Sequence, residues 1–380
     1  MSKGFLADIF SKRLVRRERR WEARVPRKPT QPTVLREPAS GVRTTARSLT
    51  SIAAAAGVSV STVSKVLNGR TDVAPATRER IGLLLRQHGY RPGARLDFGV
   101  VDLLLGLGKD QPGMIQHDPW TEQLIHGTVT AAAEAGHSVV VTQVDSAEEF
   151  DGWLELATVR GTHGALSVVH LPRGTELQRL AAAGIPVVVI DPATEPGPDV
   201  RSVGTTNWQG GLTATRHLIE LGHRRIAVIG GLPRLWSSQA RVDGYRSAML
   251  EAGLAVDERL VCHDEFSVRG GRGQATALLS LAERPTAIVA ANDAQAFGVL
   301  QALRDLGLRA PEDLSVVGFD DVPVAAWAAP PLTTIRQPLA AMAATAFRML
   351  RAGDSGTAQA DHVELATSLV VRDSTAPPRV

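Results

Sequence analysis

The chain has 380 residues, 44% of them apolar and 21% charged, which is the composition of an ordinary globular protein long enough for two or three domains. A single cysteine, Cys262, excludes a disulfide framework and a four-thiolate zinc site. No apolar stretch approaches the roughly 18 residues of a membrane-spanning helix, and the N-terminus is charged where a signal peptide would be apolar, so we expect a cytoplasmic protein with no membrane partner.

The net charge of +3 conceals a strong asymmetry along the chain. Residues 1–47 carry 13 Lys and Arg against four Asp and Glu, and residues 48–96 carry seven against two. The rest of the chain therefore bears a net charge of −11. A basic N-terminal part on an acidic body is the layout expected of a protein that meets a polyanion at one end.

Residues 1–47 are rich in arginine and proline and lack apolar periodicity, so we expect this extension to be disordered. One interpretation is a non-specific DNA-binding arm. The other, which we favour, is a solvated tail or an upstream extension created by a misassigned start codon.

Helical periodicity begins at Ser48, a candidate N-cap. Gly57 supplies a left-handed stop, Ser59 caps a second helix over residues 60–67, and a third helix opens at Pro75. Helix, tight turn, helix is the pattern of a helix-turn-helix DNA-binding domain, which we place at residues 48–92.

The second helix of such a motif enters the major groove with its N-terminal residues on base edges, and these positions are Val60, Ser61 and Lys65. Neighbouring short hydroxyl side chains can reach phosphate groups. The predicted DNA-binding set is Ser59, Val60, Ser61, Thr62, Ser64, Lys65, Asn68, Tyr90, Arg91 and Leu96.

The letters of these segments are more specific than their pattern: AGVSVSTVSKVLNG at 56–69, TRERI at 77–81 and GYRP at 89–92. They resemble the headpiece of the lactose-repressor (LacI/GalR) family of bacterial transcription factors. Further family landmarks follow in order: NWQGG at 207–211, LGHRRI at 221–226, AND at 291–293, SVVGFDD at 315–321 and PLTTI at 331–335. The resemblance implies a periplasmic-binding-protein-like body of two subdomains, with crossovers that we place near Gly204, Phe319 and Arg336.

The residues of the body predict the same α/β architecture by themselves. Strand-like apolar runs occupy residues 98–105, 138–142, 164–169, 186–190, 225–229, 287–290 and 314–317. Helical stretches alternate with them at 121–135, 209–221, 239–252 and 294–306. This alternation predicts two doubly wound parallel sheets of about six strands, covered on both faces, in an effector-binding and dimerisation domain at 98–380.

Ligands of open α/β sheets bind beyond the carboxyl ends of strands. Asp145, Asp191, Trp236 and the pair Asn292 and Asp293 all follow predicted strands. Carboxylate, amide and guanidinium groups around an aromatic face suit a polyhydroxylated ligand, so we expect a mono- or disaccharide effector.

The family resemblance implies effector contacts at Arg241 and Asp293, and a cleft-facing aromatic at Trp120. Trp327 is a further candidate for the effector site. Asn292 fits a loop cap better than a ligand contact. Asp320 and Asp321 we expect only to hydrogen-bond at a crossover.

No motif for nucleophilic, metal-dependent or phosphate-loop catalysis occurs, and the Gly-rich run at 269–273 lacks dinucleotide-binding spacing, so an enzyme is disfavoured and no cofactor or metal is expected. Cys262, His263 and Asp264 would alternate faces on a strand and do not converge on one ion.

Two function classes stay open: an effector-controlled repressor, or a solute-binding protein or sugar-modifying enzyme on the same fold. The headpiece favours a homodimeric repressor on a pseudopalindromic operator, within the nucleoid. A nucleobase or nucleoside stacked on Trp120 is the alternative effector.

The hinge departs from the family pattern, because only residues 93–97 separate Pro92 from Phe98. The family inserts a leucine from a short hinge helix into the minor groove and kinks the DNA there. Leu96 is the only candidate for that wedge, and we expect weaker bending.

Overall fold

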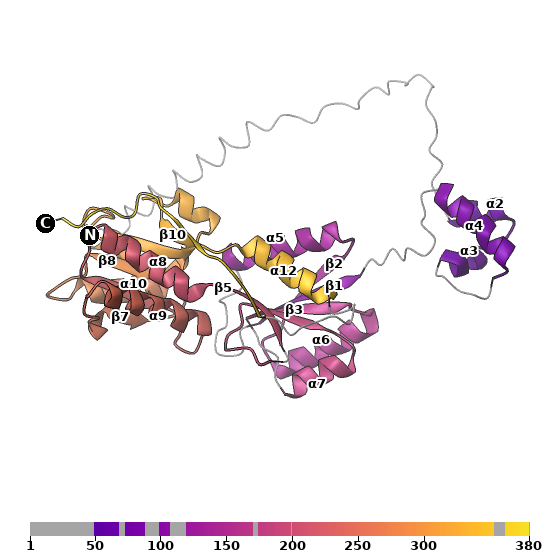
Figure 1. Ribbon diagram of the computed structural model, residues 1–380, viewed down its shortest axis with the longest axis horizontal. Helices are drawn as coiled ribbons and strands as arrows, with labels where there is room; N and C mark the ends of the chain where they lie inside the picture. The colour runs from indigo at the N-terminus through magenta and orange to yellow at the C-terminus, as the bar shows by residue number, and fades with distance from the viewer. Residues whose placement is uncertain are drawn as a thin grey trace, which may run out of the picture. The chain divides into compact units, whose positions relative to one another are not determined.

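The computed structural model describes residues 49–67, 73–87, 99–106, 119–169, 174–198, 200–352 and 362–379. The chain divides into two compact units, Met1–Gly93 and Ala94–Val380 (Figure 1). The predicted extension at 1–47, the hinge at 93–97, and Asn68, Tyr90, Arg91 and Leu96 lie outside the described residues.

The N-terminal unit contains the three expected helices. They are α2 (Leu49–Ala56), α3 (Val60–Leu67) and α4 (Pro75–Gln87). Gly57 joins α2 to α3 with a φ of 64°, a left-handed backbone that glycine adopts without strain. A small core of Ile52, Val63, Ile81 and Leu85 holds the helices together.

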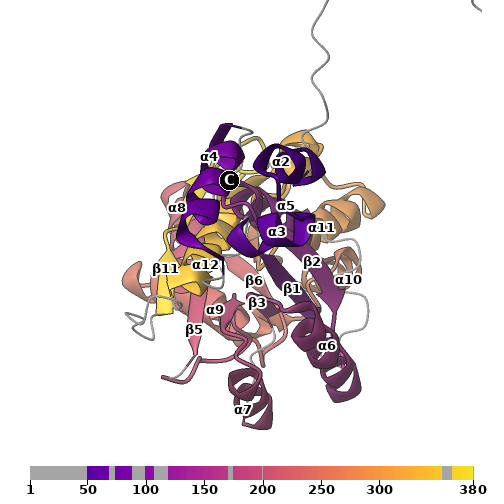
Figure 2. The ribbon, with the colours of Figure 1, turned by 90° about the vertical axis from the view of Figure 1, so that its right-hand side faces the viewer.

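The first lobe of the body is a six-stranded, all-parallel sheet in the order β11-β5-β4-β3-β1-β2. Its strands are β1 (Val100–Gly106), β2 (Ser138–Gln143), β3 (Gly164–Val169), β4 (Val187–Ile190), β5 (Arg201–Thr205) and β11 (His362–Leu365). Helices α5 (Pro119–Glu134) and α12 (Leu339–Ala352) pack on one face, and α6 (Ala147–Arg160) and α7 (Thr175–Ala182) pack on the other (Figures 1 and 2).

The second lobe repeats this plan with the order β12-β10-β9-β8-β6-β7, in which only β12 is antiparallel to its neighbour. Its strands are β6 (Ile226–Gly230), β7 (Val261–His263), β8 (Ala287–Ala290), β9 (Ser315–Asp320), β10 (Thr333–Arg336) and β12 (Ser368–Val370). The covering helices are α8 (Asn207–Glu220) and α9 (Trp236–Glu251) on one face and α10 (Val268–Leu279) and α11 (Asp293–Asp305) on the other. Two short 3₁₀ segments, Glu258–Leu260 and Pro323–Trp327, complete the lobe.

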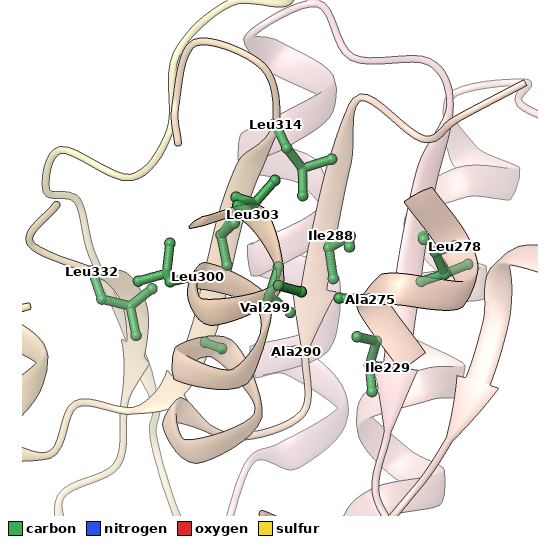
Figure 3. Close-up of a cluster of buried hydrophobic side chains, with 14 of the residues drawn as sticks. Ile229, Ala275, Leu278, Ile288, Ala290, Val299, Leu300, Leu303, Leu314 and Leu332 are labelled. Carbon is green, nitrogen blue, oxygen red and sulfur yellow. The ribbon is translucent and has the colours of Figure 1, made fainter. Parts of the chain in front are cut away.

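Strand β8 shows why a continuous apolar run forms a central strand. Ile288 and Ala290 point into the core beneath α10 and α11 (Figure 3), whereas Ala287 and Val289 point into the core beneath α8 and α9. Both faces of this strand are therefore buried, as in parallel sheets generally. The predicted pair of six-stranded sheets is confirmed.

Three segments connect the lobes, and one of them differs from the prediction. The chain crosses between β5 and α8 and again between β10 and α12, at the expected positions near Gly204 and Arg336. The third crossing joins β11 to β12 at residues 366–367. The expected crossover near Phe319 is wrong, because Phe319 lies inside β9 and the chain continues to β10 of the same sheet.

Close helix packing accounts for the glycine pairs in the body. A Cβ atom on Gly211 of α8 would lie 2.1 Å from the carbonyl oxygen of Arg241 on α9, and one on Gly271 of α10 would lie 2.1 Å from that of Gln295 on α11. The Gly-rich run at 269–273 therefore serves helix packing, because Gly271 has no side chain and the backbones of α10 and α11 can come into direct contact there.

The C-terminal segment after β12 packs along the second lobe. Ser374 is fully buried, its hydroxyl donates to the carbonyl of Val316, and the same hydroxyl accepts from the amide of Thr333. His223 lies within 2.9 Å of the Ala376 carbonyl and within 3.1 Å of the Ser315 hydroxyl. In the described residues no helix is long and apolar enough to span a bilayer.

His223 makes stability depend on pH in a defined direction. Burial lowers the pKa of His223 below 6.5, with His217 lowering it further and the Ala376 carbonyl opposing. The unfolded chain therefore takes up a proton that the folded chain refuses, and stability falls as pH drops below about 6.5, by less than about 1.4 kcal/mol per pH unit. Urea unfolding at pH 7.5 and 5.5 should show a smaller loss for His223→Gln than for wild type. The exposed His126→Gln is the control, and an identical loss in all three proteins would contradict this assignment.

Candidate functional site

The outer face of α3 carries the predicted base-reading residues. Val63 and Val66 turn into the headpiece core, and this orientation leaves Val60, Ser61 and Lys65 exposed. Ser59 caps the helix, because its hydroxyl accepts from the amide of Thr62 at 3.2 Å, as predicted.

Short hydroxyl groups cluster at the start of α3. The Ser59 hydroxyl also lies 2.7 Å from that of Ser61 and 2.8 Å from that of Thr62. These groups surround a helix N-terminus, where backbone amides favour phosphate oxygens. The surface therefore has the chemistry to bind a phosphate backbone and to present three side chains to base edges.

The body contains a cavity, partly open to solvent, between its two lobes. The first lobe contributes Trp120, Val169, Asp191 and Ala193; the second contributes Leu235, Ser237, Arg241, Phe266, Asn292 and Asp320. Val169, Asp191, Asn292 and Asp320 all lie at or just after the carboxyl ends of strands, where ligands of α/β sheets bind.

Arg241 is the central charged group of this cavity. Its side chain projects from α9, is buried, and stacks on Phe319 with 3.8 Å between the guanidinium carbon and the ring centroid. Its Nε donates to the Asn207 side-chain oxygen at 2.8 Å, and its Nη1 donates to the Ala291 carbonyl and lies 3.9 Å from an Asp320 oxygen. The guanidinium is thus fixed in place before any ligand arrives.

Two carboxyl groups face this guanidinium from opposite lobes. Burial raises the pKa of Asp191, whereas Arg241 and a hydrogen bond from Asn207 lower it. Burial also lowers the pKa of Arg241, which Asp320 and Asp191 oppose. Burying the charges of Asp191 and Arg241 is therefore costly, and each charge is stabilised by the opposite charges around it. A polar ligand that hydrogen-bonds to these groups would change that balance strongly.

Backbone strain concentrates at the same cavity. Four non-glycine residues in the described chain have left-handed φ values: Val169 at 64°, Asp191 at 50°, Asp320 at 121° and Asp321 at 58°. Three of them line the cavity. Positive φ is rare for non-glycine residues and an outlier for valine, and such strain gathers at ligand sites.

The structure gathers four of the predicted effector residues at this cavity: Trp120, Asp191, Arg241 and Asn292. Asn292 also caps α11, its side-chain oxygen accepting from the Gln295 amide at 2.8 Å, as the sequence suggested. Asp145 lies outside the cavity, where it accepts from Gln143, and Trp327 is 83% exposed on the 3₁₀ segment.

Asp293, predicted as an effector contact, does not line the cavity. It is fully buried outside the cavity lining, because its carboxyl oxygens accept from the hydroxyl of Thr334 at 2.5 Å and from the amide of Val322 at 2.9 Å. Its side chain holds the loop after β9 against β10.

Asp320 is the residue that sequence reasoning missed. We expect it from the sequence only to hydrogen-bond at a crossover, yet it lines the cavity and accepts a hydrogen bond from the side-chain amide of Gln337 at 2.6 Å. Asp321 alone matches the expectation, because it pairs with Arg336 and Arg372. Phe266 was missed as well, and its position three residues after β7 was the available signal.

A second cavity of about 790 Å³ shares Asp191 and Ser237 with the first. Trp236, predicted for the effector site, lines this second cavity and not the first. The described residues contain no group of three or more His, Cys, Asp or Glu that could hold a metal ion.

Comparisons with known proteins agree with both units. Residues 48–93 match the model described as bacterial regulatory proteins, lacI family, and residues 215–375 match the periplasmic binding protein-like domain. The HTH-type transcriptional regulator CelR of Thermobifida fusca is 35% identical over 332 residues, 85% of this chain and 96% of the relative. The HTH-type transcriptional repressor PurR of Haemophilus influenzae (strain PittEE) is 32% identical over 333 residues, 85% and 97% of the two chains.

Two solved structures extend the comparison. A CelR–cellobiose complex is 35% identical, with a TM-score of 0.66, 86% of this chain covered and 99% of the other. A lac repressor dimer bound to operator and the anti-inducer ONPF is 26% identical, with a TM-score of 0.67. The match covers 87% of this chain and 99% of the lac repressor chain.

Proposed function

This chain belongs to the LacI family of bacterial regulatory proteins and is a transcriptional regulator, and from that premise we propose that it is a repressor whose operator affinity is controlled by a mono- or disaccharide bound between the lobes. The observation that carries the proposal is the Arg241 guanidinium fixed between Asp191 and Asp320 in a cavity lined from both lobes.

The cavity chemistry suits vicinal hydroxyl groups. Carboxylate oxygens of Asp191 and Asp320 accept from hydroxyls, and the amide of Asn292 and the Arg241 guanidinium donate to them. Trp120 and Phe266 supply aromatic surface for the C–H face of a pyranose. The solved CelR relative is a cellobiose complex, which supports the same ligand class.

Coupling to DNA follows from the shared lining. A ligand that contacts both lobes stabilises only the arrangement that brings their halves together, so its binding energy is differential between conformations. Asp320 accepts from Gln337, whose side-chain oxygen accepts from Thr205 on the first crossover at 2.9 Å. Hydrogen bonds thus run from the cavity to two of the connecting segments.

The DNA-bound form we propose is a homodimer on a pseudopalindromic operator in the cytoplasmic nucleoid. The solved lac repressor neighbour is a dimer bound to operator. One headpiece with a single base-reading helix reads few base pairs, and two related by symmetry read a palindrome.

Calorimetry on the full chain tests the effector class. We expect glucose or a disaccharide such as cellobiose to bind and to change operator affinity by about 5–150-fold, the usual range of allosteric coupling. Guanine, hypoxanthine and their nucleosides test the alternative, because the rings of Trp120 and Phe266, which both line the cavity, could also stack on a planar base. Binding of a nucleobase and of no saccharide would replace the proposal.

Lys65→Ala should weaken specific DNA binding. A direct base contact is worth about 1–3 kcal/mol, so the loss should depend on the base at one operator position. Fluorescence anisotropy measures the affinity for an operator that has been selected from random duplexes. The matched control is Arg80→Ala on α4, which removes the same charge from an exposed site. An equal loss on random DNA would show that Lys65 contacts only phosphate.

A further inference from the structure

The second cavity lies at the first crossover and shares Asp191 and Ser237 with the first cavity. Trp208 from α8 and Trp236 from α9 line it from the second lobe, and His362 and Glu364 line it from the edge strand β11 of the first lobe. Like the first cavity, it is built from both lobes.

Three aromatic side chains that are not core residues line this cavity. Trp208 is 43% exposed at the first turn of α8. The ring of Trp236 packs against that of His362, with 5.5 Å between centroids and a 41° tilt. Two indole rings and an imidazole at one cavity present flat apolar surface of the kind that receives the C–H face of a sugar ring.

Polar groups stand around these rings. The Nδ1 of His362 lies 2.7 Å from the Ser202 hydroxyl, which orients the imidazole with its Nε2 3.8 Å from a Glu364 oxygen. The side chains of Asn207 and Gln209 line the same cavity. Carboxylate, amide and imidazole groups beside an aromatic surface can accept from and donate to several hydroxyls at once.

The two cavities are also linked electrostatically. Asn207 lines the second cavity, accepts from Arg241 of the first, and hydrogen-bonds to Asp191, which lines both. A ligand that engages Asn207 therefore changes the partners of both charged groups in the first cavity. Occupation of the two cavities should be energetically coupled.

We propose that the second cavity is a further carbohydrate site that binds a pyranose unit against Trp208 and Trp236, either as the end of a longer oligosaccharide or as a separate saccharide molecule. The proposal rests on the saccharide effector proposed above for the first cavity.

The experiment is calorimetry on the full chain with glucose, cellobiose and cellotetraose. If one oligosaccharide occupies both cavities, cellotetraose should bind at least about tenfold more tightly than cellobiose, with one molecule per chain. If separate molecules bind, glucose or cellobiose should show a second binding event. Trp208→Ala should remove the tenfold gain in affinity or the second binding event, because truncating a central aromatic anchor lowers affinity by about tenfold or more. Binding in the first cavity should be unchanged.

Matched variants make the result specific. Trp208→Phe should restore most of the gain, and Trp327→Ala, which removes an equally large ring from outside both cavities, should leave it unchanged. One binding event of equal affinity for all three sugars, insensitive to Trp208→Ala, would overturn the second site and leave the proposed function intact. Absence of binding by every saccharide would instead overturn the proposed function, and the second site with it.

Discussion

Arg241→Ala is expected to abolish the effector response while leaving operator DNA binding in place. The guanidinium faces carboxyl groups from both lobes, and a hydrogen bond between a charged group and a neutral hydroxyl contributes about 1.5–3 kcal/mol. Loss of two such bonds to a ligand lowers saccharide affinity by roughly a hundredfold or more. Calorimetry measures the affinity, and anisotropy on operator DNA with and without saccharide measures the response.

The same change should destabilise the body. Removing one member of a buried charge cluster typically costs about 3–5 kcal/mol, because the remaining charges lose their partner. Arg216→Ala is the matched control, since Arg216 forms a half-exposed ion pair with Glu251 between α8 and α9 and such pairs contribute about 1 kcal/mol or less. A normal response to saccharide in folded Arg241→Ala would remove this cavity as the effector site.

The position of Arg241 explains how one side chain can serve both stability and regulation. It binds Asn207 at the first crossover and faces Asp320, which is tied through Gln337 to Thr205 at the same crossover. A ligand that competes for Arg241 or Asp320, as proposed, would disturb hydrogen bonds that reach the first crossover. In the proposed mechanism, lobe closure and ligand binding share these hydrogen bonds, which is what a differential affinity requires.

Much of this site could be predicted from one rule of topology, which is that ligands bind at the carboxyl ends of parallel strands. The rule can be applied to any residue that directly follows a clearly predicted strand. Asp191 and Asn292 follow β4 and β8, whose apolar runs are unambiguous. Trp120 and Arg241 came from the family resemblance and also line the cavity.

Asp293 and Asp320 show where sequence reasoning stops. A Cβ atom on Gly318 would lie 2.3 Å from an Asp293 oxygen. Because this position of β9 is a glycine, there is room for the buried carboxyl group of Asp293. Asp320 reaches the cavity from a backbone with φ of 121°, a conformation that no residue pattern announces. Backbone geometry thus decides which of the two aspartates lines the cavity.

The third crossover was missed for a different reason. β11 and β12 are edge strands of four and three residues, and every one of these residues is exposed or half-buried. Such segments carry little apolar periodicity, so the crossing between them was wrongly placed near Phe319. Phe319 itself is core, and its ring is the surface on which Arg241 stacks.

Asp293 should make the stability of the protein fall as the pH rises. Burial raises the pKa of Asp293 to about 7, against the hydrogen bonds from Thr334 and Val322 that lower it. The folded chain therefore keeps a proton on this carboxyl group that the unfolded chain releases near pH 3.8. Its contribution is fully present below pH 3.8 and is lost as the pH rises to about 7, by about 1.4 kcal/mol per pH unit.

Asp293→Asn isolates this effect, because an asparagine of the same shape does not titrate. The free energy of unfolding in urea, compared between wild type and variant at pH 5, 6, 7 and 8, should show a penalty for the variant that shrinks by about 1.4 kcal/mol per unit up to pH 7 and is constant above it. The opposing contribution of His223 is present in both proteins and cancels in the difference. A penalty that is the same at every pH would mean that Asp293 is ionised in the folded state, with Val322 and Thr334 sufficient to hold the charge against its burial.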